Sequence, residues 1–210
     1  MSGRFRDRGR WVATCHNQAM AKIVLFHSML GLRSVELRAA DRLRAAGHEV
    51  ITPDLYARQT ASTLDEGFQL KDHRIGWATI EQRADQAVQN LPADTVLAGI
   101  SMGAGVVSTL LPQRPDTAGV LLLHGLAPIP TTARDGLPVQ LHVADADEFA
   151  PPVEVAAWLE AATRTGVDAQ VFTYQQAGHF FTDPSLPDHN AQATTLTWQR
   201  VLDFLRTVSG

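Results

Sequence analysis

Hydrophobic positions along the chain alternate between two periods from residue 21 onward. Short, nearly continuous runs of aliphatic residues predict strands covered on both faces. Segments with apolar positions three and four apart predict amphipathic helices. The predicted strands cover residues 21–27, 48–52, 94–100, 119–124, 139–143 and 169–174, and the predicted helices cover residues 35–46, 77–90, 104–111, 153–165 and 190–208. A polar stretch at 56–76 interrupts this pattern and contains one short predicted helix at 64–70.

Strands that alternate with helices predict a mostly parallel central sheet with helices on both faces. We find no internal repeat and no composition change that would mark a second domain, so residues 20–210 are predicted to form one α/β domain without a large lid. Only 56–76 and 126–137 are long enough to shape a pocket. Ligands of such sheets bind at the carboxyl ends of the strands, so the residues that end each strand are the candidates for chemistry.

Composition and charge narrow the function classes. The 210 residues are 45% hydrophobic and 19% charged, as in a globular domain with a large core. A net charge of −4 and a pI near 6.0 argue against nucleic acid or an anionic membrane as partner. No apolar run approaches the about 20 residues of a membrane helix. Residues 1–19 carry four arginines without periodicity and are predicted to be a disordered basic tail. The tail lacks a secretory signal and holds the one cysteine, Cys15, so we expect a cytoplasmic protein without an intrachain disulfide.

The segment GISMG at residues 99–103 follows one predicted strand and precedes a predicted helix. This is the G-x-S-x-G pattern in the strand–turn–helix context from which a nucleophilic serine projects. Side chains at Gly99 or Gly103 would collide with the neighbouring strand and helix. The helix directs its N-terminal amides, and the positive end of its dipole, at the place where an oxyanion forms. Ser101 is therefore the predicted nucleophile.

A serine nucleophile needs a histidine as general base, and His179 follows the last predicted strand. The acid that orients this base is expected after the preceding strand, where ADADE at residues 144–148 offers Asp145, Asp147 and Glu148. Asp147 is favoured because it lies further past the strand and so reaches toward His179, and Asp145 is the alternative. Acids at this place also cap helices, which is the bland interpretation of the same residues.

The order serine, aspartate, histidine along the chain is that of α/β-hydrolases. In that fold the loop after the first strand supplies one oxyanion donor, so we assign the two donors to the backbone N–H groups of Leu30 and Met102. The loop's bland interpretation is a plain strand-to-helix turn. A metal site from His27, His124 and Asp145 is disfavoured, because their spacing matches no ligand pattern. We expect neither a metal nor a cofactor.

Five segments together resemble the dienelactone hydrolase family of α/β-hydrolases, from about residue 21 to the C-terminus. They are HSMLGL at 27–32, TPDLY at 52–56, GISMGAG at 99–105, ADADEFAPP at 144–152 and AGHFFTDP at 177–184. The resemblance implies an α/β-hydrolase fold and hydrolytic chemistry. It also supports Asp147, because the family's acid stands just before a short apolar–proline segment.

The sequence departs from the dienelactone-cleaving members of that family at three places. Those members use a cysteine nucleophile where this chain has Ser101, and a glutamate in the first-strand loop where it has Ser28. They also hold the substrate carboxylate with arginines, one of them soon after the histidine, where this chain has Asp183. The resemblance therefore implies the fold and the chemistry but not the dienelactone substrate.

We expect a cofactor-independent serine hydrolase that cleaves small carboxylic esters or lactones through an acyl-enzyme. Acyl transfer to an acceptor other than water, and a non-catalytic binding protein on the same fold, are the alternatives. A pocket for a free carboxylate needs a cationic partner, and the segment 56–76 offers only Arg58, Lys71 and Arg74, each more typical of a solvated surface charge. Neutral esters are therefore the expected substrates.

Overall fold

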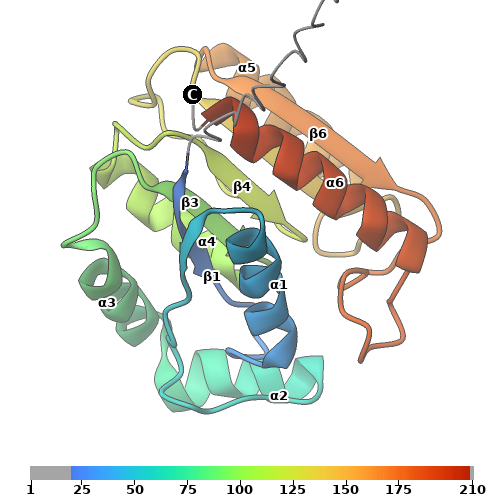
Figure 1. Ribbon diagram of the computed structural model, residues 1–210. Helices are drawn as coiled ribbons and strands as arrows, with labels where there is room; N and C mark the ends of the chain where they lie inside the picture. Colours follow the sequence, from blue (N-terminus) through green and yellow to red (C-terminus); the bar gives the residue numbers. More distant parts are fainter. Residues whose placement is uncertain (1–19, 209–210) are drawn as a thin grey trace, which may run out of the picture.

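Six strands form the centre of the molecule in the computed structural model, which describes residues 20–208 (Figure 1). Their order across the sheet is β2-β1-β3-β4-β5-β6, and every neighbouring pair is parallel. This confirms the predicted parallel sheet, whereas the predicted tail at residues 1–19 lies outside the described residues. The strands are β1 (Lys22–Phe26), β2 (Glu49–Ile51), β3 (Val96–Ile100), β4 (Val120–Leu123), β5 (Pro138–Ala144) and β6 (Asp168–Tyr174).

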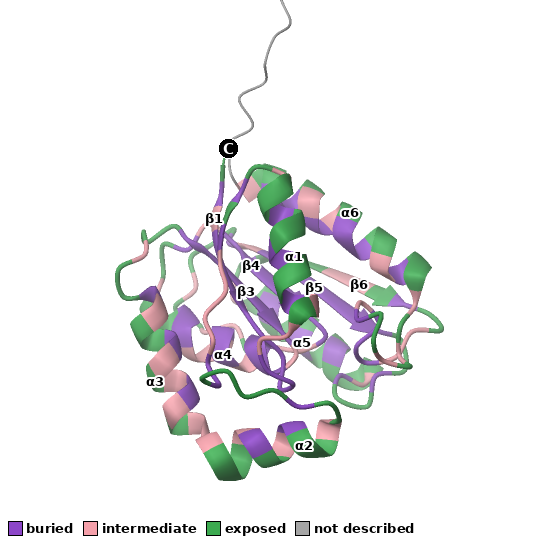
Figure 2. Ribbon diagram, turned by 60° about the horizontal axis from the view of Figure 1, so that its bottom comes forward, coloured by how far each residue is buried: buried purple, intermediate pink, exposed green. Residues whose placement is uncertain are grey.

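Helices cover both faces of the sheet, and each face has its own hydrophobic core (Figure 2). The helices are α1 (Ser34–Ala45), α3 (Trp77–Val88), α4 (Met102–Leu110), α5 (Pro152–Arg164) and α6 (Ala191–Val208). On one face α1 and α6 pack against strand residues such as Leu25 and Leu121. On the other face α3, α4 and α5 pack against the alternate residues, such as Val24 and Leu122. The inner strands are therefore apolar on both sides, which explains their nearly continuous aliphatic runs.

The polar segment 56–76 contains more helix than predicted. After α2 (Leu64–Phe68) the chain continues as a π-helix, η1 (Gln69–Ile75), where a single helix at 64–70 was expected. Thr63 begins α2, since its hydroxyl accepts a hydrogen bond from the Glu66 N–H at 3.2 Å. A π-helix has a wider turn than the 3.6-residue period used to find helices, so the apolar pattern did not reveal η1.

The inner strands end at the same edge of the sheet. The register pairs Phe26 with Gly99, and Leu123 with both Ile100 and His142, so the residues that follow these strands lie side by side. The helix α4 begins at Met102, two residues earlier than predicted, and only Ser101 separates it from β3. Among residues 20–208, no helix is both long and apolar enough to cross a membrane.

Candidate active site

Ser101 occupies a one-residue turn between β3 and α4. Its backbone has φ 52° and ψ −109°, a conformation that a residue with a side chain rarely adopts. The Ser101 N–H donates to the Leu123 carbonyl at 2.7 Å, and its own carbonyl accepts from the Ala104 N–H at 2.8 Å. These two bonds hold the turn between the sheet and the first turn of α4, with the hydroxyl at the carboxyl edge of the sheet.

Glycines on both sides of Ser101 allow this turn to pack. A Cβ at Gly99 would lie 2.2 Å from the Gly103 carbonyl oxygen, and one at Gly103 would lie 2.4 Å from the Phe26 carbonyl oxygen. Both distances are far inside van der Waals contact and both obstacles are backbone, so neither can move aside. A side chain at either position would therefore collide with helix α4 or strand β1, as expected from the sequence.

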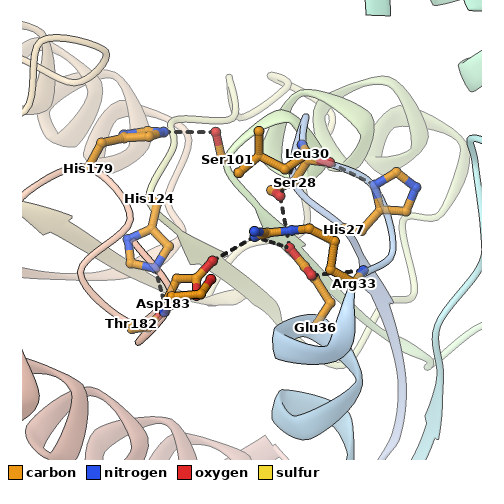
Figure 3. Close-up of polar contacts among 11 residues, drawn as sticks. His27, Ser28, Leu30, Arg33, Glu36, Ser101, His124, His179, Thr182 and Asp183 are labelled. Atoms are coloured by element: carbon orange, nitrogen blue, oxygen red, sulfur yellow. Dashed lines mark hydrogen bonds and ion pairs between the residues drawn. The ribbon is translucent and has the colours of Figure 1, made fainter. Parts of the chain in front are cut away.

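The structure brings Ser101, His179 and Asp147 together. Ser101 Oγ lies 2.9 Å from His179 Nε2, and His179 Nδ1 lies 2.7 Å from Asp147 Oδ2 and 2.9 Å from Oδ1 (Figure 3 shows the first contact). Asp147 is 2% exposed, and its Oδ1 also accepts from the Phe149 N–H at 2.9 Å. Asp145, the alternative acid, is exposed, and of the two aspartates it is Asp147 that meets the His179 ring.

The Leu30 N–H, the donor expected from the loop after β1, has a partner inside the protein. The Leu30 N–H donates to Ser28 Oγ at 3.3 Å, so this donor is directed into its own loop. Met29 and Met102 both line the pocket at Ser101. Within residues 20–208 neither of their N–H groups donates to another protein group. The geometry therefore favours Met29 over Leu30 as the partner of Met102.

The loop after β1 is also held by a buried histidine. His27 Nδ1 lies 2.7 Å from the Ser28 carbonyl oxygen, and the Leu55 N–H donates to His27 Nε2 at 3.0 Å. These partners require a neutral ring with its proton on Nδ1. Burial lowers the pKa of His27, which agrees with that form. His27 thus ties the loops after β1 and β2 together.

Two further histidines at this edge are buried and neutral. His124 follows β4 with φ 62°, and its Nε2 lies 2.7 Å from Thr182 Oγ1. Its Nδ1 is buried and has no hydrogen-bond partner among residues 20–208. Burial, and then the neighbouring His179, lower the pKa of His124 well below the usual range. In β5, His142 lies between Tyr174 and Gln140, and burial lowers its pKa to about 3. No group of three metal-ligating side chains gathers anywhere in the described part of the chain.

A pocket of about 290 Å³ opens at Ser101 and His179. Its walls are mainly apolar, and one cation, Lys71 of η1, lies among the lining residues. Lys71 pairs with Asp72 and lies 5.7 Å from the centre of the Phe68 ring. Arg58 and Arg74, the other cations considered, are exposed and do not line the pocket. No signal in the sequence set Lys71 apart from them, and the π-helix that carries it was not predicted. The lining residues are Met29, Lys71, Trp77, Ser101, Met102, Gly105, His124, Gly125, Leu126, Phe149 and His179.

The chain has the α/β-hydrolase fold, and solved structures with that fold resemble it. A dienelactone hydrolase-like promiscuous phosphotriesterase from metagenomic libraries has a TM-score of 0.69 at 20% identity, covering 91% of this chain and 87% of its own. The structure described as m3DLH has a TM-score of 0.74 at 19% identity, with coverages of 93% and 89%. Esterase PE8 has a TM-score of 0.63 at 19% identity, with coverages of 90% and 93%.

The sequence profile of the dienelactone hydrolase family matches residues 10–209, nearly the whole chain. The chain therefore belongs to the dienelactone hydrolase family and is a hydrolase that acts on ester bonds. No curated protein sequence matches it.

Proposed function

We propose that the protein is a serine hydrolase that cleaves small carboxylic esters or lactones through an acyl-enzyme. The observation that carries this proposal is the position of His179, which lies within hydrogen-bond distance of both Ser101 and the buried Asp147 beside an open pocket. That is the arrangement in which a histidine can take the serine proton during attack. No metal or cofactor enters the proposed reaction.

Each residue has a defined role in the proposed mechanism. Ser101 Oγ attacks the carbonyl carbon while His179 Nε2 takes its proton, and the same proton then passes to the leaving group. Asp147 accepts from Nδ1–H, which keeps the lone pair on Nε2 and stabilises the imidazolium. Water repeats the sequence on the acyl-enzyme and releases the acid. The N–H groups of Met102 and Met29 bind the oxyanion, and one such donor contributes about 3 kcal/mol in other hydrolases.

The pocket supports neutral acyl groups in preference to anionic ones. Lys71 is the one cation among the lining residues described, and Asp72 already pairs with it, so a substrate carboxylate would have to compete with that partner. An anion in a mainly apolar pocket without a free cation is strongly disfavoured. Position 183 adds no cation, because it holds an aspartate whose carboxylate is buried in an ion pair with Arg33.

Matched substrates test this function. We expect neutral short-chain esters, such as p-nitrophenyl acetate and butyrate, to be hydrolysed with a kcat/KM at least about tenfold above that of a carboxylated ester of equal size, a ratio of about 1.4 kcal/mol. The carboxylated substrate and its methyl ester should be compared at low and high salt, with product analysis to separate hydrolysis from acyl transfer. A preference for the free carboxylate that salt weakens would contradict the expected pocket chemistry and would identify Lys71 as its partner.

A further inference from the structure

The loop that carries His179 is organised mainly by bonds within itself. The Phe181 N–H donates to the Gly178 carbonyl at 3.1 Å, and the Asp183 N–H donates to the Phe180 carbonyl at 2.8 Å. The Phe180 N–H donates to Asp188 Oδ2 at 2.9 Å. These bonds give the loop a shape, but they do not place it relative to Ser101, which belongs to a different part of the chain.

Two adjacent side chains in this loop bond outward instead. Thr182 Oγ1 lies 2.7 Å from Nε2 of His124, the residue after β4, and Asp183 Oδ2 accepts from Arg33 Nη2 at 2.7 Å (Figure 3). They lie only three and four residues past His179. The two contacts lie on opposite sides of β3, the strand that leads to Ser101. His124 follows β4, which neighbours β3 on one side, and Arg33 lies between α1 and β1, which neighbours β3 on the other side.

Asp183 has no capacity left for a substrate. It is 2% exposed, and its Oδ1 accepts from both the N–H and the hydroxyl of Ser185, at 2.9 and 2.6 Å. Burial alone would raise the pKa of Asp183, but the bonds from Ser185 and then the Arg33 charge outweigh it, so that the pKa lies below the usual value. The carboxylate is therefore ionised and fully paired, as a structural tie requires.

From Arg33 the contacts continue into the loop after β1. Glu36, itself 2% exposed, accepts from Arg33 Nη2 at 3.3 Å and from Ser28 Oγ at 2.8 Å. Ser28 Oγ in turn accepts from the Leu30 N–H. One continuous set of polar contacts thus joins the loop of the candidate base to the loop that presents the Met29 amide (Figure 3).

We propose that Thr182 and Asp183 are positioning residues that hold His179 in register with Ser101 and with the oxyanion loop. This inference rests on the proposed function and adds residues to it that touch neither the substrate nor the reacting atoms. The physical reason is the tolerance of the chemistry, because a shift of about 1 Å in a catalytic group lowers the rate by about 100-fold. At position 183, where dienelactone-cleaving relatives are expected to hold substrate, this chain instead holds its own catalytic loop.

Two nearly isosteric substitutions test the anchor, by which we mean the outward contacts of Thr182 and Asp183. Asp183→Asn removes the charge that binds Arg33, and Thr182→Val removes the hydroxyl that meets His124. We expect each to lower kcat for a neutral ester by about 10- to 100-fold and to leave KM within about twofold, because neither substituted side chain lines the pocket. Asp203→Asn is the matched control, since it breaks an exposed ion pair with Arg206 far along α6 and should leave kcat unchanged.

A second measurement separates the anchor from a general loss of stability. The imidazole proton between His179 Nδ1 and Asp147 is expected to resonate at low field in proton NMR of the wild-type protein. Its signal should weaken or broaden in both variants but not in the control. All proteins are compared at a temperature at which thermal unfolding finds each of them folded. Wild-type kcat with an intact low-field proton in both variants would overturn the anchor. A wild-type protein that hydrolyses no ester would overturn the proposed function instead, while the NMR comparison would still decide the anchor.

Discussion

Ser101→Ala is expected to lower ester turnover by about five to six orders of magnitude, as loss of the nucleophile does in other serine hydrolases. In the described part of the chain, Ser101 supplies the hydroxyl that His179 Nε2 contacts. In the variant this nitrogen would face a methyl group, so the proposed reaction would have no nucleophile. The fold should persist, since the backbone bonds that hold the turn do not use the Ser101 side chain.

The measurement combines initial rates with covalent labelling. A fluorophosphonate should add one adduct to the wild-type protein, mapped by peptide mass spectrometry to the segment that contains Ser101, and none to the variant. Ser108→Ala serves as the control, because Ser108 lies on α4 and its hydroxyl donates to the Gly105 carbonyl of the same helix. Wild-type turnover or labelling in Ser101→Ala would remove this residue from the mechanism.

Asp147→Asn should lower kcat by about 10⁴-fold, by analogy with the same change in a serine protease. The amide that replaces the carboxylate would present an N–H to His179 Nδ1, so the imidazole proton would move to Nε2. A protonated Nε2 cannot accept from Ser101, although every heavy atom stays in place. Asp145→Asn provides the matched control, because Asp145 is exposed and should change kcat by no more than about twofold. The reverse order of effects, measured as kcat at saturating ester, would transfer the role to Asp145.

The fold and the core of the candidate site were accessible from sequence because local patterns specify them. Buried strands appear in the sequence as runs of aliphatic residues. The turn at Ser101 appears as two glycines, at positions where any side chain would collide with backbone. Asp147 was favoured over Asp145 by its reach past the strand and by the family resemblance, and its burial now agrees with that choice. These features depend on neighbours in the chain, so a single sequence contains them.

The features that sequence reasoning missed depend on distant neighbours. Arg33 and Asp183 are 150 residues apart, and nothing local to either predicts their bond. The amide direction that favours Met29 over Leu30 is set by the Ser28 hydroxyl, which requires the loop geometry. Lys71 lines the pocket from η1, a π-helix that the apolar pattern did not reveal. The aspartate at position 183, where the family resemblance leads one to expect an arginine, was the one signal in the sequence that set this position apart.

Because His27, His124 and His142 are buried, the folded protein binds protons at these three side chains less readily than the unfolded chain does. All three have a lowered pKa when folded, while in the unfolded chain each would titrate near about 6.5. Below that pH the unfolded chain binds more protons than the folded one, so the free energy of unfolding must fall with acidification. Urea unfolding should therefore have a lower midpoint at pH 5.5 than at pH 7.5, and an equal or higher one would contradict the linkage. The same buried histidines at the carboxyl edge of the sheet, two of which hold loops there, therefore set a lower limit on the pH at which the enzyme stays folded.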